Sequence, residues 1–564
     1  MLPGCQPVYT RATDADSLSS SCRACLPILG SRGFVRYNRL VHKLTAIFLA
    51  LLSAAALAAQ GRSKWVYFDE DHRLQYGTDA HGNRIMDFSH AGYKGGGVAI
   101  PTVRVARTLG PAAGDSTARI QAAIDEVSKI EADADGFRGA VLLEPGVYEV
   151  ATTLRIAASG VVLRGSGSND GGTTLNVTGE PHRFLDVSGS GERQPQGDPV
   201  AVTDRYVPSG ADWLHVESAA GFEVGDTILI QRPVTEAWIH FMGMDTLVRN
   251  GRPQTWLQAG RIIHADRTIK AIVRDRIVLD VPLSDSYDAR YLDPPGTTVV
   301  KYTFPGRIEQ VGLESLRVAV PPRDAPITRG QFTLLRMNAV TDGWVRDVVV
   351  QDTQNTITLG STVRRVTLEN VHIRHSVPFT GAASPADIAI SGTQILVDRC
   401  SVSGRRMWPV VTQVGVTGPN VVLHFKSDEA GIAPHQRWAT GLLVDSSEFR
   451  NGTERRPNIA FSNREHAGSG HGWSAGWSVA WNVKADYLLI QQPPGSMNWC
   501  IGCTGRYTPI LWHGNAIELP TIPSQAIESP NDPVEPASLY LWQLRERLGE
   551  TALENIGYGR ESAR

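Results

Sequence analysis

The sequence predicts an all-β protein whose chain winds into a parallel β-helix. Three observations support this prediction: one helix is followed by very short strands at glycine turns, several later segments resemble one another at irregular spacings, and glycine and proline are abundant. The chain contains 55 Gly and 33 Pro in 564 residues, and 42% of its residues are hydrophobic while 20% are charged. Such a composition is typical of a globular chain with many tight turns.

The first regular element is expected between residues 114 and 131, which read GDSTARIQAAIDEVSKIE. Asp115 or Ser116 can cap this helix. A strand, a Pro-Gly turn and a second strand follow between residues 139 and 150, and two more short strands lie at 154–156 and 161–165. A helix at this place covers the open end of the hydrophobic stack in a β-helix. Its apolar residues fall at helical spacing: Ile120, Ala123, Ile124 and Val127.

This opening resembles the pectate-lyase-like superfamily, whose members typically begin with GDxTxxIQxAID and continue with a Pro-Gly turn and an LxGxG segment. The resemblance implies a right-handed parallel β-helix that acts on a polysaccharide, either as a lyase or as a polygalacturonase-like hydrolase. It indicates the fold more strongly than the reaction. The matching residues are Gly114, Asp115, Thr117, Ile120, Gln121, Ala123, Ile124, Asp125, Pro145, Gly146, Tyr148, Leu163, Gly165 and Gly167.

A different pattern occupies residues from about 205 to 305, with longer strands, more aromatic residues and turns such as Asn250-Gly251. We expect a β-rich insertion there, forming a small lobe that overhangs the β-helix. The solenoid pattern then returns, and aligning Val348, Val371 and Cys400 gives steps of 371 − 348 = 23 and 400 − 371 = 29 residues. Irregular periods of this size fit coils of three short strands with loops of varying length, whereas a β-sandwich would have more even strands.

Both ends of the chain differ from the β-helix domain expected at residues 60–530. Residues 41–59 have the layout of a secretory signal peptide, with a basic start, an apolar middle and small residues at its end. Residues 1–40 have no apolar periodicity and are interpreted as an over-extended start or a leader. In the tail, residues 531–564, an amphipathic leucine pattern predicts a helix that packs against the β-helix or covers its end. The protein is therefore expected to be secreted or periplasmic.

The cysteines sort into two groups. Cys5, Cys22 and Cys25 precede the expected signal peptide, which leaves Cys400, Cys500 and Cys503. An odd number argues against a complete disulfide framework. Cys500 and Cys503 can form a small disulfide or remain two thiols, and zinc would need two further ligands.

Candidate site residues concentrate in two glycine-flanked passages, 433–441 and 462–474, which the coil pattern places on protruding loops. Cleavage of a uronate polymer by β-elimination needs a base and a cation that stabilises the sugar carboxylate. We assign the base to His471 and the carboxylate contacts to Arg437 and Arg464, with His435 and Lys426 as second choices. The residues expected to contact the substrate, including two tryptophans suited to sugar stacking, are Trp438, Trp473, Glu465, His466 and Asn463.

Two other functions stay open. A glycoside hydrolase would need paired carboxyl groups, and Asp445, Glu465, Asp428 and Glu429 are the candidates. The Gly470-His471-Gly472 segment resembles the GHG motif of polygalacturonase-type hydrolases, but their accompanying NTD and paired-Asp motifs are missing. The other alternative is a carbohydrate-binding or surface β-helix protein that cleaves nothing.

The expected partner is a polysaccharide, bound by a monomer. The chain has 55 basic and 57 acidic residues and a formal net charge of −2, so neither nucleic acid nor, after signal cleavage, a membrane is expected as a partner. A local basic groove for an acidic sugar stays compatible with this balance. The family resemblance allows a Ca²⁺ cofactor, although no dense DxDxD-type cluster demands one, and no metal ligands are assigned.

Overall fold

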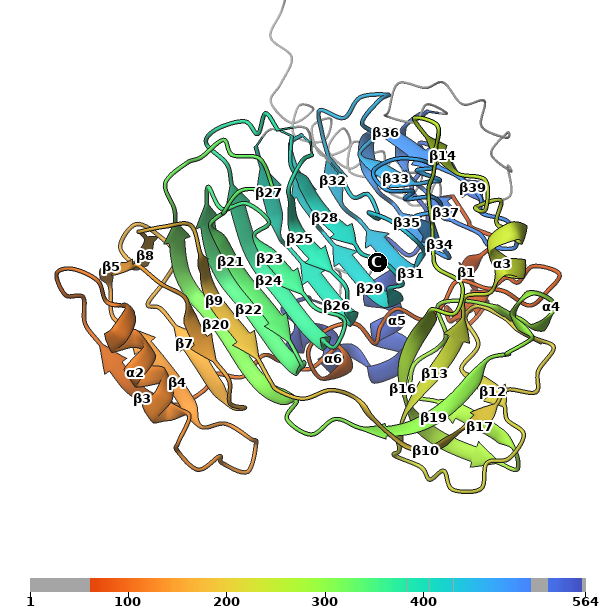
Figure 1. Ribbon diagram of the computed structural model, residues 1–564, viewed down its shortest axis with the longest axis horizontal. Coiled ribbons are helices and arrows are strands. Elements are labelled where there is room, and N and C mark those ends of the chain that lie inside the picture. Colours follow the sequence, from red (N-terminus) through yellow and green to blue (C-terminus); the bar gives the residue numbers. More distant parts are fainter. Residues whose placement is uncertain (1–60, 382, 405, 430, 509–525, 560–564) are drawn as a thin grey trace, which may run out of the picture. The chain divides into compact units, whose positions relative to one another are not determined.

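The computed structural model describes residues 61–381, 383–404, 406–429, 431–508 and 526–559. In this part of the chain the strands wind into a solenoid of three parallel sheets, here named A, B and C (Figure 1). The predicted fold class is therefore confirmed: a parallel β-helix with a capping helix, a β-rich insertion and a C-terminal helix. The proposed leader and signal peptide, residues 1–59, lie outside the described residues.

Sheet A runs along the full solenoid, and it shares three long strands with sheet B. Its strands are β3 (Val105–Leu109), β4 (Gly139–Leu143), β7 (Val161–Arg164), β20 (Ile308–Ala319), β22 (Val340–Gln351), β24 (Arg364–Arg374), β26 (Thr393–Asp398), β29 (Thr417–Leu423), β31 (Ala439–Asp445), β34 (Ala475–Gly476), β35 (Val479–Trp481), β37 (Trp499–Ile501) and β39 (Ile527–Glu528).

Sheets B and C complete each coil. Besides the second halves of β20, β22 and β24, sheet B contains β5 (Gly146–Val150), β8 (Thr173–Val177), β27 (Ser401–Ser403), β30 (Lys426–Ser427), β32 (Glu448–Phe449), β36 (Lys484–Ile490) and β38 (Thr504–Tyr507). Sheet C contains β6 (Leu154–Ile156), β9 (Arg183–Ser188), β21 (Thr333–Asn338), β23 (Ile357–Leu359), β25 (Ala386–Ile390) and β28 (Trp408–Thr412), and bridges through Ile432 extend it to β33 (Ile459–Phe461).

The bend from sheet A into sheet B is made by one residue per coil with a left-handed backbone. This conformation crowds an ordinary side chain, and Asn and Asp tolerate it better than most residues. Asn370 also donates a hydrogen bond from Nδ2 to Oδ1 of Asp347 in the preceding coil, at 2.7 Å, so the corners stabilise one another. The corner residues and their φ angles are Ser315 (59°), Asp347 (55°), Asn370 (53°), Arg399 (50°), His424 (47°), Ser446 (47°) and Asn482 (49°).

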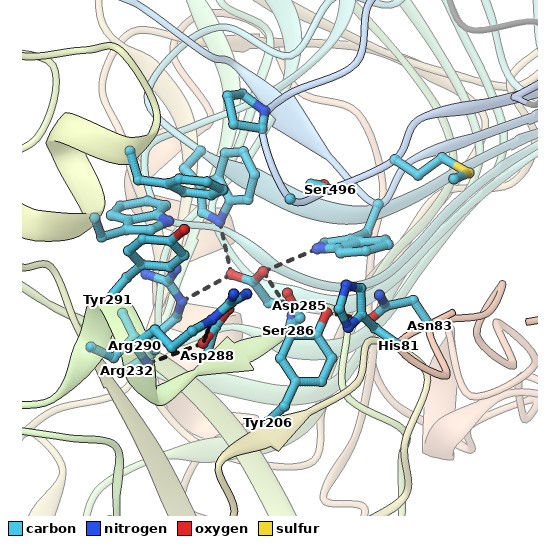
Figure 2. A pocket seen from close by; sticks show the side chains of 18 of the residues that line it. His81, Asn83, Tyr206, Arg232, Asp285, Ser286, Asp288, Arg290, Tyr291 and Ser496 are labelled. Atoms are coloured by element: carbon cyan, nitrogen blue, oxygen red, sulfur yellow. Dashed lines mark hydrogen bonds and ion pairs between the residues drawn. The ribbon is translucent and has the colours of Figure 1, made fainter. Parts of the chain in front are cut away.

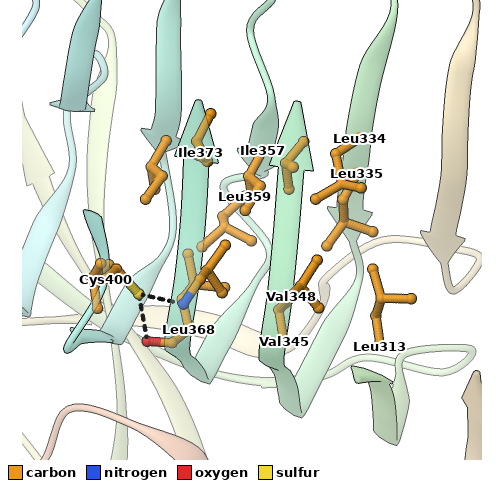
Figure 3. Close-up of a cluster of buried hydrophobic side chains, with 14 of the residues drawn as sticks. Leu313, Leu334, Leu335, Val345, Val348, Ile357, Leu359, Leu368, Ile373 and Cys400 are labelled. Carbon is orange, nitrogen blue, oxygen red and sulfur yellow. Dashed lines mark hydrogen bonds between the residues drawn. The ribbon is translucent and has the colours of Figure 1, made fainter. Parts of the chain in front are cut away.

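The core is a stack of aliphatic side chains inside the coils (Figure 3). Leu313, Val345 and Leu368 pair in successive strands and are fully buried, which contributes roughly 1.5–3 kcal/mol for each such side chain. Val348 pairs with Val371 as the 23-residue step predicted, and the Val371 amide donates to Cys400 Sγ at 3.4 Å. The sequence-derived register is therefore correct.

The capping helix α2 (Thr117–Val127) lies at the first coils, beside β3 and β4 (Figure 1). Its four predicted apolar residues are buried, and they are Ile120, Ala123, Ile124 and Val127. Of the two proposed caps, Asp115 accepts a hydrogen bond from the Thr117 amide at 3.0 Å, while the Ser116 side chain makes no capping bond.

The insertion forms an antiparallel sheet, here named the insertion lobe, with strand order β10-β19-β13-β16-β17-β12. Aromatic and aliphatic residues of the lobe pack against outward-facing side chains of sheet A, and this cluster is separate from the solenoid core. The elements of the lobe are β10 (Gln194–Ala201), β11 (Tyr206–Val207), β12 (Trp213–His215), β13 (Thr227–Pro233), α3 (Glu236–Phe241), β14 (Val248–Arg249), β15 (Arg252–Pro253), β16 (Ile262–Val273), β17 (Arg276–Leu279), β18 (Tyr287–Asp288), α4 (Ala289–Leu292) and β19 (Thr298–Thr303).

The C-terminal helices α5 (Leu539–Leu548) and α6 (Glu550–Asn555) pack along the outside of sheet A, together with the N-terminal elements β1 (Val66–Phe68), β2 (Leu74–Tyr76) and η1 (Tyr93–Gly95). Of the two positions expected for the tail, the structure shows the one against the side of the β-helix. None of the helices in the described residues is long and apolar enough to cross a membrane.

The three described cysteines, Cys400, Cys500 and Cys503, are buried free thiols. Burial raises the pKa of the Cys503 thiol well above its ordinary value. Of the two states left open for Cys500 and Cys503, the structure therefore shows the thiols.

Candidate functional site

A groove of about 860 Å³ lies on the outer side of sheet C, and we name it the arginine groove. Its floor includes Ala386, Trp408, Val411 and Ala433. The register explains this floor, because Val410 and its bridge partner Ile432 are buried in the solenoid core, and the next residue on each strand points to the opposite side. The floor is therefore apolar although it lies outside the core.

Cationic side chains line the walls of the groove. The cationic residues are Arg249, Arg406, Arg455, Arg456 and Arg464. The imidazoles of His435 and His471 also line the groove, and none of its described lining residues is Asp or Glu. Burial and the neighbouring Arg406 lower the pKa of Arg456 to about 10, and burial lowers that of Arg464 to about 10. Both guanidinium groups therefore stay charged at neutral pH, and the groove favours an anionic ligand.

Arg456 also defines the aromatic part of the groove. Its guanidinium carbon lies 4.5 Å from the centre of the Trp408 ring. Its Nη2 donates to the backbone oxygen of Met407 at 3.1 Å, which fixes the guanidinium over the indole. A cation above an aromatic face presents charge and an apolar surface side by side, a combination suited to an acidic sugar ring.

Two histidines meet at one end of the groove. The ring centres of His435 and His471 lie 4.8 Å apart, with an angle of 84° between the ring planes. Nδ1 of His435 is 3.1 Å from Oε1 of Gln413, and because a carboxamide oxygen only accepts, Nδ1 carries the proton and Nε2 is left as an acceptor. Burial, together with Arg464 and Arg437, lowers the pKa of His435 to about 4. His435 is therefore neutral at pH 7 and able to accept a proton.

The loop that carries His471 is held from two sides. Arg437 donates from Nη2 to the backbone oxygen of Ser469 at 2.9 Å and to its Oγ at 2.7 Å. Arg249, from the insertion lobe, donates to the backbone oxygen of Gly468. Gly468 has φ of 57°, and a Cβ there would lie 2.2 Å from Nε2 of His471. The absence of a side chain at Gly468 thus leaves the space that the His471 imidazole occupies.

Three of the five residues predicted to be catalytic line the groove: His435, Arg464 and His471. Arg437 does not, because its guanidinium holds the Ser469 loop. Lys426 lies elsewhere, exposed on β30 of sheet B and paired in register with Glu448. Lys426 is therefore not brought together with the two loops, because its sequence position did not reveal which sheet it occupies.

The two tryptophans expected to stack on sugars belong to the contact between the insertion lobe and the β-helix. Trp438 is 2% exposed and donates from Nε1 to Asp285 at 2.8 Å, and Trp473 is 8% exposed and donates to the Met242 backbone oxygen at 3.2 Å. Neither lines the groove. The insertion lobe covers both rings, so they do not lie beside the histidines of the groove, and their role as substrate contacts stays a prediction.

Three further predicted contact residues, Asn463, Glu465 and His466, lie in the His471 loop but do not line the groove. The Asn463 amide donates to Gln491 Oε1 at 2.6 Å, and its side chain accepts from the Glu465 amide at 2.9 Å. Nδ1 of His466 lies 3.9 Å from a carboxylate oxygen of Glu465. These residues shape the loop rather than the groove surface.

Trp408 and four of the five groove arginines were not predicted as site residues from the sequence. Arg405-Arg406 and Arg455-Arg456 are adjacent basic pairs, and such pairs in two loops that precede strands of the solenoid are a signal that could have revealed part of the cationic wall. Arg249 carried no such signal, because it reaches the groove from the insertion lobe.

The carboxylates proposed for hydrolysis do not converge in the groove. Asp445 is fully buried and accepts hydrogen bonds from Ser538 Oγ and the Tyr540 amide, both at 2.8 Å, so it anchors the start of α5. Burial raises the pKa of Asp445 to about 6. The Glu429 carboxylate accepts from the Arg406 amide at 3.3 Å, and neither Glu429 nor Asp428 lines the groove.

The described residues that line the groove offer no carboxylate ligands to the Ca²⁺ ion that the family resemblance allows. Across the described residues, no three His, Cys, Asp or Glu side chains are grouped so that they could hold a metal ion. The residues present at this site therefore do not fit a bound Ca²⁺.

Fold and site together define a parallel β-helix protein with a cationic surface groove. The sequence matches no protein-family model and no curated protein. Among solved structures, the chain is similar to the tailspike of Acinetobacter baumannii bacteriophage AP22 in complex with capsular saccharide. The two sequences are 8% identical, the alignment covers 74% of this chain and 66% of the tailspike chain, and the TM-score is 0.30. It is also similar to a tailspike of E. coli bacteriophage HK620 in complex with a pentasaccharide, at 10% identity over 79% and 62%, with a TM-score of 0.37. Similarities of this size do not assign a function.

Proposed function

We propose that the protein binds an acidic polysaccharide in the arginine groove and cleaves it by β-elimination. One observation carries the proposal: five arginines and two histidines line the groove, and no described lining residue is acidic. A polymer with regularly spaced carboxylates matches such a wall, and the apolar floor with Trp408 can contact the carbon faces of its sugar rings.

The chemistry follows from the positions of the charges. Arg464 and Arg456 pair with the uronate carboxylate and stabilise the negative charge that develops when the neighbouring C5 proton is removed. His471 takes that proton, with His435 as the second candidate. The electron pair of the broken C5–H bond forms the C4=C5 double bond, the C4–O bond breaks, and water protonates the departing oxygen.

Two alternatives have less support. Hydrolysis needs two carboxyl groups about 5 Å apart, or about 6.5–9.5 Å apart for inversion, flanking the scissile bond. The described lining of the groove supplies neither of them. Binding without cleavage uses the same groove, so only a measurement of products separates it from elimination. Export of the protein remains part of the proposal and rests on the apolar segment at 41–59.

The test measures the absorbance of unsaturated uronate ends while the purified protein is mixed with a panel of acidic polysaccharides, with and without EDTA. We expect an increase that persists in EDTA, falls to a small residual rate in His471→Ala and is retained in His466→Ala, a histidine of the same loop outside the groove. New reducing ends without absorbance would show hydrolysis instead. If the polysaccharide binds but neither product appears, the protein binds the polysaccharide without cleaving it.

A further inference from the structure

A second cavity, of about 190 Å³, lies where the insertion lobe meets the N-terminal segment and the 494–497 loop (Figure 2). We name it the Arg232 pocket. Its walls contain many aromatic side chains: Tyr206, Trp238, Phe241, Tyr291, Trp438 and Trp477. It shares no lining residue with the arginine groove. The pocket is therefore a separate feature that the proposed cleavage does not use.

The polar centre of the pocket is a buried ion pair. Arg232 is 3% exposed, and its Nε lies 3.3 Å from Oδ2 of Asp285 (Figure 2). The carboxylate of Asp285 also accepts from Trp438 Nε1 at 2.8 Å and Trp477 Nε1 at 3.2 Å. A further hydrogen bond comes from the Ser286 amide at 2.9 Å. Both oxygens of Asp285 are thus fully engaged.

Arg232 has hydrogen-bonding capacity left over. Its guanidinium lies 4.0 Å from the centre of the Trp238 ring, and its Nη1 makes no hydrogen bond within the described residues. The hydroxyl of Ser496, another lining residue, also makes none there. A buried donor without an acceptor costs about 1–3 kcal/mol, and more when it is charged, so two such groups at one cavity indicate a bound oxygen-rich molecule.

The charges of the pocket disfavour an anion. Three carboxylates line it, Asp79, Asp285 and Asp288, against the two guanidinium groups of Arg232 and Arg290. Asp288 is already paired with Arg290 at 2.6 Å, and Asp285 with Arg232. A neutral hydroxyl fits better, because it can accept from Arg232 and donate to Ser496 at the same time.

The size of the pocket limits the ligand. A volume of about 190 Å³ corresponds to about six water molecules, at roughly 30 Å³ each. That space fits one sugar ring, and the aromatic walls can contact its C–H faces. We infer that the Arg232 pocket binds a single neutral sugar unit, either a free monosaccharide or the end of a glycan. This inference goes beyond the proposed polysaccharide cleavage and does not depend on it.

The experiment titrates the full chain with neutral monosaccharides, with neutral trisaccharides that end in the same sugars, and with a uronic acid. Binding is followed by tryptophan fluorescence, since Trp238, Trp438 and Trp477 line the pocket. We expect a neutral sugar to change the emission and, in the groove variant Arg456→Gln, the uronic acid to bind at least about tenfold more weakly than the neutral sugar. If monosaccharide and trisaccharide bind with equal affinity, a free monosaccharide is sufficient as the ligand of the pocket. If the trisaccharide binds more tightly, the ligand is the end of a glycan.

Variants separate this site from the groove. Ser496→Ala should weaken sugar binding several-fold, and the paired change Arg232→Gln with Asp285→Asn should abolish it without leaving one buried charge alone. Arg456→Gln, in the groove, should leave it unchanged. If the paired variant does not fold, the neutral-sugar affinity of Ser496→Ala alone tests the inference. Absence of binding by every neutral sugar at millimolar concentration, uronic acid binding that is tighter than that of any neutral sugar and persists in Arg456→Gln, or unchanged neutral-sugar affinity in Ser496→Ala would each overturn the inference.

Discussion

The rings of His435 and His471 lie 4.8 Å apart and almost perpendicular, although 36 positions separate them (471 − 435) in the sequence. The backbone explains this contact, because the Arg437 amide donates to the His471 backbone oxygen at 3.0 Å and so joins the loops of two neighbouring coils. The solenoid thereby places two imidazoles at the end of one cationic groove.

The first prediction concerns the pH dependence of cleavage. The pKa of His435 is lowered to about 4, so its imidazole is neutral, and active as a base, at every pH above that value. In His471→Gln we expect a residual activity that is constant from about pH 5 to 8 and lost as the pH falls through about 4. Changing His435 to Gln as well should remove a further factor of about 10²–10⁴. A residual activity that titrates near pH 6.5 would contradict the assignment of His435.

The second prediction concerns affinity for an anionic oligosaccharide. Arg456→Gln removes a charged donor from the groove, and a charge-assisted hydrogen bond contributes about 1.5–3 kcal/mol, so Kd should rise by at least about tenfold at low salt. The matched control is Arg450→Gln, since Arg450 is exposed and paired with Glu448 outside the groove. Titrations at low and high salt should show the difference shrinking as salt rises. Equal affinities of the two variants at low salt would exclude the groove as the binding site.

The third prediction concerns stability in acid. Burial, Arg399 and Lys426 lower the pKa of His424 from 6.5 to about 4, and its Nδ1 is 2.8 Å from the hydroxyl of Tyr558 near the C-terminus. Because the folded state holds the neutral form, this contribution is present above pH 6.5 and is lost as the pH falls toward 4. The difference corresponds to about 3 kcal/mol.

The comparison for His424 is His424→Asn, because asparagine tolerates the left-handed corner at φ of 47° and does not titrate. Denaturant unfolding at pH 7.5 and pH 4.5 should show a larger loss of the unfolding free energy in the wild type than in the variant. Parallel losses in both proteins would mean that His424 is not the group responsible.

The fourth prediction concerns the glycine below the groove floor. A Cβ at Gly431 would lie 1.5 Å from the backbone oxygen of Asn458 in the next coil, whereas Gly171 has open space around its Cβ position. Gly431→Ala should therefore lower the unfolding free energy by about 3 kcal/mol or more, and Gly171→Ala should change it little. Thermal unfolding of both variants checks this, and similar midpoints would show that neighbouring coils can separate at Asn458.

Much of the fold could be predicted because β-helix coils are specified locally. Each coil repeats the same alternation of buried and exposed residues, so aligning Val348 with Val371 was enough to obtain the register. The positions of His435, Arg464 and His471 in one groove could be predicted for the same reason, since glycine-flanked loops of neighbouring coils lie next to each other in a solenoid.

The tertiary structure alone decided which of the remaining candidates face the groove. Lys426 lies on sheet B and Trp438 under the insertion lobe, while Arg249 comes from that lobe to contact the Gly468 loop. The residue pattern within a coil determines which side chains enter the core. The outward side chains that stay accessible are determined instead by the packing of the insertion lobe, which ends 135 residues before Trp438 (438 − 303). The sequence by itself determined the solenoid and its histidine loops, and long-range packing determined the cationic groove.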